Sequence, residues 1–96
     1  MTRIRILLVC TANVCRSPMA EAILAGLLHQ RGVDAEVMSA GFLGGGQQMD
    51  PDALAAVAHE GPQMKDHVSM PIRPLLIQGA DLVLGMEREH VRGVVV

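Results

Sequence analysis

Apolar residues follow two different spacings in the first third of the chain. Ile4–Val9 is a nearly continuous apolar run, which is typical of a strand buried on both faces of a parallel sheet. Over Met19–Leu28 the apolar positions instead recur at helical spacing, and Gly32 lies where a helix C-terminus is expected. Ser17 and Pro18 precede this repeat and are favoured at the N-cap and first position of a helix. The pattern therefore predicts a strand followed by a helix that begins at Pro18.

The rest of the chain repeats the same two patterns in shorter pieces. Strands are predicted at Ala35–Met38 and Ala80–Leu84, helices from Asp50 to Gly61 and over Met86–Arg92, and loops at Gly41–Gln48 and Pro62–Gly79. In the second loop, Pro71 and Pro74 exclude a long helix, although Leu75–Gln78 has room for one turn. This β-α-β-α-β-α order implies a doubly wound parallel sheet, with a ligand site at the carboxyl end of the first strand.

The segment Cys10–Pro18 lies at that carboxyl end and contains the reactive residue types. A loop that leads into a helix N-terminus collects free backbone N–H groups and partial positive charge, so it suits a tetrahedral dianion. Cys10 at the rim of this loop would react as a thiolate. The guanidinium of Arg16 is able to bind two oxygens of a phosphoryl group at once. The spacing therefore brings together a nucleophile, an anion-binding loop and a bidentate cation.

Composition excludes several other classes of function. The 96 residues allow one domain, and 50% of them are hydrophobic, as in a globular chain. A net charge of −2 gives no basic field for nucleic acid, and no apolar run approaches the about 18 residues of a membrane span. The two cysteines have a poor spacing for zinc, and without a secretory signal they indicate free thiols in the cytoplasm. We expect no nucleic-acid partner, no membrane association and no metal.

Cys10–Ser17 resembles the phosphate-binding loop of the low-molecular-weight protein tyrosine phosphatase family, which runs Cys-x-Gly-Asn-x-Cys-Arg-Ser. Thioredoxin-coupled arsenate reductases share much of this architecture. The likeness continues along most of the chain, in Ala20-Glu21, Ser39-Ala40-Gly41, Asp50-Pro51, His67 with Ser69, and Ala80–Leu84 followed by Met86. Two departures stand out: Ala12 replaces a glycine of the family, and the second Asp-Pro pair, which carries the family's general acid, has no counterpart here.

The resemblance implies an α/β, doubly wound, flavodoxin- or Rossmann-like three-layer fold with a short parallel sheet. The last strand and helix of the family are expected to be missing, so that residues 1–96 would form a single domain that is incomplete at its C-terminus. One edge of the sheet would then be open. We therefore expect reduced stability, or self-association through that edge.

The resemblance also assigns roles to the loop. Cys10 would be the nucleophile that forms a phosphocysteine, Arg16 would bind the phosphoryl oxygens, and Ser17 would stabilise the leaving thiolate. The phosphate-binding residues would be Thr11, Ala12, Asn13, Val14, Cys15 and Arg16. A buried structural cysteine at a strand end is the plainer interpretation of Cys10, but Arg16 at this spacing favours catalysis.

The resemblance also implies supporting roles for other residues, and a simpler interpretation exists for some of them. A network that holds the loop open is expected among Asn13, Ser17, Ser39 and His67. A loop histidine such as His67 is, however, equally common on a protein surface. Cys15 would form a reversible disulfide with Cys10 that protects the nucleophile, or it is a small buried residue beneath the loop.

Three further residues bear on activity and substrate. Ala12 costs about 1 kcal/mol or more if its position needs a positive φ, and otherwise it stiffens the loop. Val14 lies where relatives that act on phosphoarginine have threonine, which favours an aryl phosphate as the substrate. Asp50 is expected to be a helix N-cap rather than a general acid, because Pro51 and an alanine-rich run follow it.

The expected function is hydrolysis of phosphotyrosine-like monoesters through a cysteinyl-phosphate intermediate, without a cofactor, on a phosphorylated protein or a small aryl phosphate. Lack of the general acid predicts weakened activity. Two alternatives stay open. Arsenate reductase normally needs further cysteines, although an external thiol is able to replace one of them. A non-catalytic module would bind phosphate or another oxyanion in the same loop without turnover.

Overall fold

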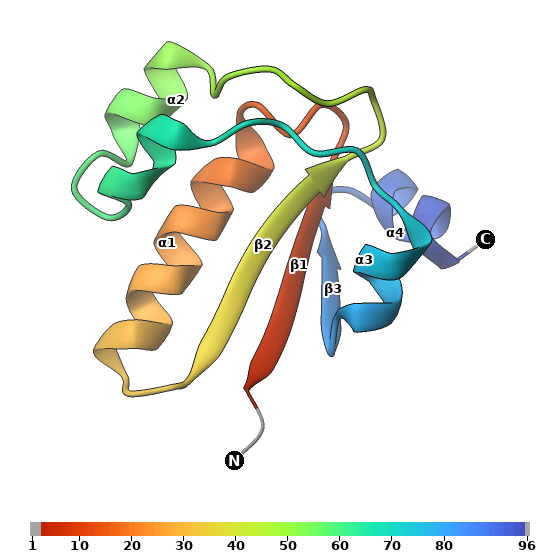
Figure 1. Ribbon diagram of the computed structural model, residues 1–96, viewed down its shortest axis with the longest axis horizontal. Helices are drawn as coiled ribbons and strands as arrows, with labels where there is room; N and C mark the ends of the chain where they lie inside the picture. The colour runs from red at the N-terminus through yellow and green to blue at the C-terminus, as the bar shows by residue number, and fades with distance from the viewer. Residues whose placement is uncertain (1–2, 96) are drawn as a thin grey trace.

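The computed structural model describes residues 3–95, and a three-stranded parallel sheet lies at its centre (Figure 1). The strands are β1 (Ile4–Cys10), β2 (Ala35–Gly41) and β3 (Leu82–Gly85), in the order β2-β1-β3. Cys10 pairs with Gly41, and Val9 pairs with Gly85. Because all three strands run in the same direction, the segments that follow them meet at one edge of the sheet, where Cys10 lies.

Helices cover both faces of the sheet. They are α1 (Arg16–Gln30), α2 (Pro51–Ala56), the 3-10 helix Pro62–Asp66, α3 (Pro74–Gly79) and α4 (Arg88–Val95). Figure 1 shows α1 and α2 on one side of the sheet and α3 and α4 on the other. The chain has one α-helix more between β2 and β3 than the predicted order, but the parallel sheet with helices on both faces confirms the doubly wound α/β fold. No helix within residues 3–95 is both long and apolar enough to cross a membrane.

Two apolar clusters hold these layers together. The first lies between α1 and the segment around α2, and consists of Ala22, Met49, Ala53, Val57 and Met64. The second lies on the other face, where buried Leu7, Val9 and Ala40 pack against residues of α3, β3 and α4. Burial of β1 from both sides explains why its sequence is almost continuously apolar.

The observed boundaries differ from the predicted ones at several elements. β2 continues beyond Met38 to Gly41, because Ser39 and Ala40 are buried and remain paired with β1. The turn predicted near Leu75 is a six-residue helix, α3. The last strand and helix each lie closer to the C-terminus than predicted, at Leu82–Gly85 and Arg88–Val95.

The start of α1 also differs from the prediction. The helix begins at Arg16, with Cys15 in the N-cap position and no side chain that caps this end by a hydrogen bond. The prediction that Ser17 is the N-cap was therefore wrong. Its hydroxyl contacts Cys10 and Asn13 instead, so it is not available to the helix backbone.

The start of α2 agrees with the prediction. Pro51 is its first residue, and the Asp50 carboxylate accepts a hydrogen bond from the N–H of Ala53 at 3.1 Å. The backbone N–H of Asp50 donates to the carbonyl of Val14 at 2.7 Å. Asp50 therefore caps this helix and ties it to the loop after β1.

Candidate active site

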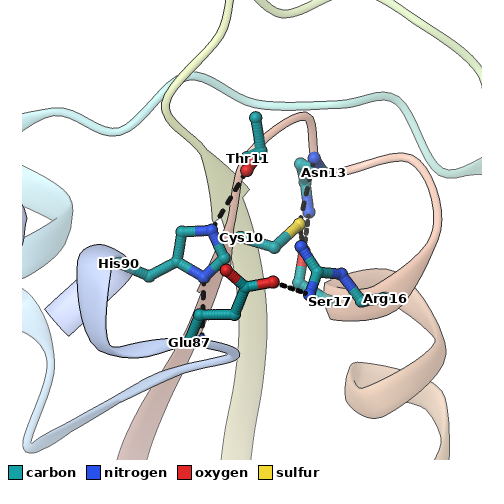
Figure 2. A network of polar contacts seen from close by, with 7 residues as sticks. All are labelled: Cys10, Thr11, Asn13, Arg16, Ser17, Glu87 and His90. Carbon is teal, nitrogen blue, oxygen red and sulfur yellow. Dashed lines mark hydrogen bonds and ion pairs between the residues drawn. The ribbon is translucent and has the colours of Figure 1, made fainter.

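Cys10 is the last residue of β1, and its side chain is only 3% exposed. Its sulphur lies 2.8 Å from the Ser17 hydroxyl oxygen and accepts the backbone N–H of Asn13 at 3.2 Å (Figure 2). Residues 10–16 line a cavity of about 120 Å³. A buried sulphur with two hydrogen-bonding groups directed at it therefore lies beside a small cavity.

Asn13 fixes the shape of the loop. Its φ of 61° lies in the left-handed region, which asparagine tolerates better than most residues. Its buried side chain donates to the Ser17 hydroxyl at 2.9 Å and accepts the backbone N–H of Met70 at 2.9 Å. Its carbonyl oxygen lies 2.9 Å from Nε2 of His67. The predicted links from Asn13 to Ser17 and His67 are therefore present.

Ser39 does not join that network, which corrects the prediction. Its hydroxyl donates to the Glu21 carboxylate at 2.5 Å, and no hydrogen bond joins it to Asn13 or His67 within residues 3–95. Burial raises the pKa of Glu21, although the hydrogen bond from Ser39 and the nearby His67 act in the opposite direction. Ser39 supports the loop only indirectly, through its place in β2.

Ala12 causes no strain in the loop. Among residues 3–95, Asn13 is the only residue other than glycine with a positive φ, so alanine at position 12 is allowed. The residue that must be small is Gly41, at the end of β2. A Cβ added there would lie 2.8 Å from the carbonyl carbon of Ala12 and 2.9 Å from the backbone N of Asn13.

Cys15 is half-buried at the start of α1 and packs against the first apolar cluster. Both Cys10 and Cys15 are free thiols. The position of Cys15 therefore agrees with the plainer interpretation of a small residue beneath the loop. A reversible disulfide between the two cysteines stays a prediction.

Arg16 forms an ion pair that the sequence did not reveal. Its Nη1 donates to the Glu87 carboxylate at 2.6 Å, across the mouth of the loop (Figure 2). This hydrogen bond raises the pKa of Arg16 and lowers the pKa of Glu87. Both side chains are about half exposed, so the pair adds little stability, but it restrains an otherwise flexible guanidinium.

His90 is a second group from the same segment that reaches the loop. Its side chain is buried, and its Nε2 lies 3.1 Å from the Thr11 hydroxyl oxygen. Its Nδ1 accepts the backbone N–H of Glu87 at 3.0 Å, and its ring stacks on that of Phe42 with centroids 5.8 Å apart. The only sequence signal for Glu87 and His90 was their position just after the last predicted strand, because segments that follow parallel strands meet at one edge of the sheet.

A family model for low molecular weight phosphotyrosine protein phosphatases matches residues 5–95. The chain belongs to this family. It is 40% identical over 86 residues to the protein-arginine-phosphatase of Bacillus subtilis (strain 168), an alignment that covers 88% of the chain and 57% of that relative. The family assignment thus agrees with the loop geometry around Cys10 and Arg16.

Solved phosphatase structures of the family have the same fold. The low molecular weight protein tyrosine phosphatase from T. tengcongensis superposes with a TM-score of 0.88 at 38% identity, over 96% of this chain and 64% of that one. A mutant of the YwlE arginine phosphatase with a phosphorylated active-site serine superposes with a TM-score of 0.84 at 34% identity, over 96% of this chain and 60% of that one. The chain therefore spans less than two-thirds of the length of these phosphatases.

Proposed function

We propose that the chain hydrolyses phosphomonoesters by transferring the phosphoryl group to the Cys10 thiolate. The observation that carries the proposal is the pair of contacts to the Cys10 sulphur, from Ser17 at 2.8 Å and from the Asn13 N–H at 3.2 Å, beside the loop cavity. Both contacts favour the thiolate, which is the form of cysteine that attacks phosphorus. The phosphorylated active-site serine in the related YwlE mutant supports the same chemistry.

The reaction would proceed in two steps. First the sulphur of Cys10 attacks phosphorus, the bond from phosphorus to the leaving-group oxygen breaks, and its electron pair goes to that oxygen. Arg16 binds two non-bridging oxygens and stabilises the charge of the transition state. Water then attacks the phosphocysteine, phosphate is released, and the electron pair of the P–S bond returns to the sulphur, where the Ser17 hydroxyl stabilises the thiolate. Neither step requires a metal ion or an organic cofactor.

Protonation of the leaving group is the step that these residues support least. The loop residues that line the cavity include no carboxyl group. Asp50 caps α2, and the hydrogen bond from Arg16 lowers the pKa of Glu87, which makes Glu87 a poor proton donor. We therefore propose that the 96-residue chain takes this proton from solvent and is weak on esters with poor leaving groups.

The experiment that tests the proposal compares two aryl phosphates as substrates of the 96-residue chain and of its Cys10→Ser variant. p-Nitrophenyl phosphate has a good leaving group and should be hydrolysed, whereas phenyl phosphate should react about 10²–10⁴ times more slowly, the usual contribution of a general acid. A chelator should change neither rate. Activity that survives in Cys10→Ser would contradict the nucleophile, and equal rates on the two esters would contradict the lack of a general acid.

Phosphotyrosine is the substrate that we favour, and phosphoarginine is the second candidate. Val14 is an apolar, branched side chain in the wall of the cavity, which suits an aryl ring. The similarity to a protein-arginine-phosphatase favours the second candidate. We expect the chain to prefer p-nitrophenyl phosphate over phosphoarginine, and Val14→Thr to shift this ratio of kcat/KM towards phosphoarginine by about tenfold, as for a change of one methyl group to hydroxyl in a pocket. A wild-type preference for phosphoarginine would contradict our choice.

The biological substrate that we propose is a phosphorylated protein, in line with the family. We place the reaction in the cytoplasm, because a free thiol at the centre of the mechanism needs a reducing compartment. Immunolocalisation with activity assayed before and after addition of a thiol reductant would test this. An enzyme recovered from an oxidising compartment in active form would contradict it.

A further inference from the structure

The N-terminal turn of α4 is built around His90. Glu87 occupies the N-cap position of this helix, and His90 is the third residue after it. The imidazole reaches back and accepts the N–H of Glu87 through Nδ1 at 3.0 Å, as the glutamate of a capping box would do. Because Nδ1 is an acceptor here, the proton of the neutral ring is on Nε2.

Nε2, which carries the proton of the neutral ring, is directed at the loop after β1. It lies 3.1 Å from the Thr11 hydroxyl, which accepts its hydrogen bond (Figure 2). Thr11 is the first residue after Cys10 and lines the loop cavity. The backbone of the same residue is also held, because its carbonyl accepts the N–H of Leu43 at 2.9 Å. His90 therefore contacts the loop at Thr11, whereas His67 contacts it at Asn13.

His90 also contacts the loop that follows β2. Its ring stacks on Phe42, with an interplanar angle of 20°. The Phe42 ring lies so close to Gly93 of α4 that a Cβ at position 93 would approach it to 2.6 Å. One buried imidazole thus joins three segments around the cavity: the loop after β1, the loop after β2, and α4.

We propose that His90 is a positioning residue for phosphate binding, which acts by holding Thr11 through a hydrogen bond and Phe42 through stacking. The inference rests on the proposed function, because it deepens the account of the same site. The hydrogen bond from His90 restrains the residue that follows the nucleophile, so that less loop entropy is lost when phosphate binds.

The first test is the tautomer of His90, which needs no ligand and no turnover. Nitrogen chemical shifts of the histidine rings in the full 96-residue chain at neutral pH should show His90 with Nε2 protonated and Nδ1 unprotonated. The Thr11→Val variant should change the Nε2 shift of His90 and leave those of His29 and His59 unchanged, since both are exposed and distant in sequence. A His90 ring protonated on Nδ1 alone, or one that averages between tautomers, would overturn the proposal.

The second test is the affinity for inorganic phosphate, measured by calorimetry. Thr11→Val removes the hydroxyl at nearly constant shape, and His90→Phe keeps a ring to stack on Phe42 but removes both hydrogen bonds. Each should weaken phosphate binding by about three- to tenfold, the usual value of one hydrogen bond. The double variant should be no weaker than the single ones. Thr11→Ser should restore wild-type affinity, and the matched control His59→Gln should retain it.

The outcomes separate this inference from the proposed function. Phosphate binding that depends on Thr11 and His90, without turnover of p-nitrophenyl phosphate, would overturn the hydrolase proposal alone. Wild-type affinity in Thr11→Val, or additive losses in the double variant, would overturn the role of His90 alone. A folded wild-type chain that binds no phosphate would overturn both. If His90→Phe does not fold, the comparison of Thr11→Val with Thr11→Ser still decides the question, because the Thr11 side chain is exposed.

Discussion

At the scale of single residues, each polar group around Cys10 is held by a partner that orients it. The side-chain amide of Asn13 both donates and accepts a hydrogen bond. The Ser17 hydroxyl lies between Asn13 and the Cys10 sulphur, and Glu87 restrains Arg16 through an ion pair. A site of this kind requires little rearrangement when a phosphoryl group enters, which is the condition for efficient electrostatic stabilisation. The residues that we propose to be catalytic thus depend on the residues that hold them in place.

Glu21 gives a prediction about pH at this scale. Burial raises its pKa in the folded state, so its contribution to stability is complete at acid pH, below the unfolded pKa, and is lost as the pH rises through the folded value. The Glu21→Gln variant has no side-chain charge to bury, so it does not lose this stability at higher pH. Its amide oxygen still accepts the hydrogen bond of Ser39. At neutral pH the variant should be more stable in urea unfolding by up to about 1 kcal/mol, a gain limited by partial exposure of the group.

The control for this prediction is the same comparison at a pH below the unfolded pKa of glutamate. There the wild-type side chain is already neutral, so the advantage of Glu21→Gln should vanish. A variant that is less stable than wild type at neutral pH would show that the carboxylate charge, through its attraction to His67, contributes more than burial costs.

At the scale of elements, the end of β2 shapes the loop as much as the loop's own residues do. Gly41 pairs with Cys10, and the backbones of Thr11, Ala12 and Asn13 pass directly over its Cα. In the same region the N–H of Phe42 donates to the Cys10 carbonyl at 3.2 Å. The end of β2 therefore supports the backbone of the loop after β1, and a side chain at position 41 would clash with that backbone.

Gly41→Ala should disturb this contact. Its Cβ would meet three backbone atoms at 2.8 to 2.9 Å, and a backbone is unable to move aside as a flexible side chain does. We expect a loss of about 1–3 kcal/mol in unfolding free energy, as for overpacking, with weaker phosphate binding. The matched control is Gly44→Ala in the neighbouring loop, where an added Cβ meets no atom within 4 Å. Equal effects of the two substitutions would contradict this account.

Elements also show what the sequence was able to predict. The apolar run of β1, the helical repeat of α1 and the Asp50-Pro51 start of α2 were correct because local pattern and tertiary packing agree there. The prediction of the helix start was wrong at Ser17, because serine is a common N-cap but its hydroxyl here contacts Cys10 and Asn13. The end of β2 beyond Met38 was not predicted, because Ser39 and Gly41 are weak strand formers. Pairing with β1 keeps them extended.

At the scale of the whole molecule, the parallel topology assembles the site from segments far apart in the sequence. Arg16 and Glu87 are separated by 71 positions, and Thr11 and His90 by 79. No local pattern relates such pairs, so the sequence revealed the loop but not Glu87 and His90, which contact it from the start of α4. The predicted self-association stays untested. Within residues 3–95, β3 pairs only with β1, and its Leu82 and Leu84 side chains are exposed.

The central claim is that Cys10 takes the phosphoryl group from the substrate. The most direct measurement mixes the chain with p-nitrophenyl phosphate, quenches the reaction within its first turnovers, and maps phosphoryl groups on the peptides by mass spectrometry. We predict one phosphoryl group on Cys10, absent when Cys10→Ala is treated in the same way. A folded chain that releases nitrophenolate with no phosphoryl group on Cys10, or with one on another residue, would contradict the account.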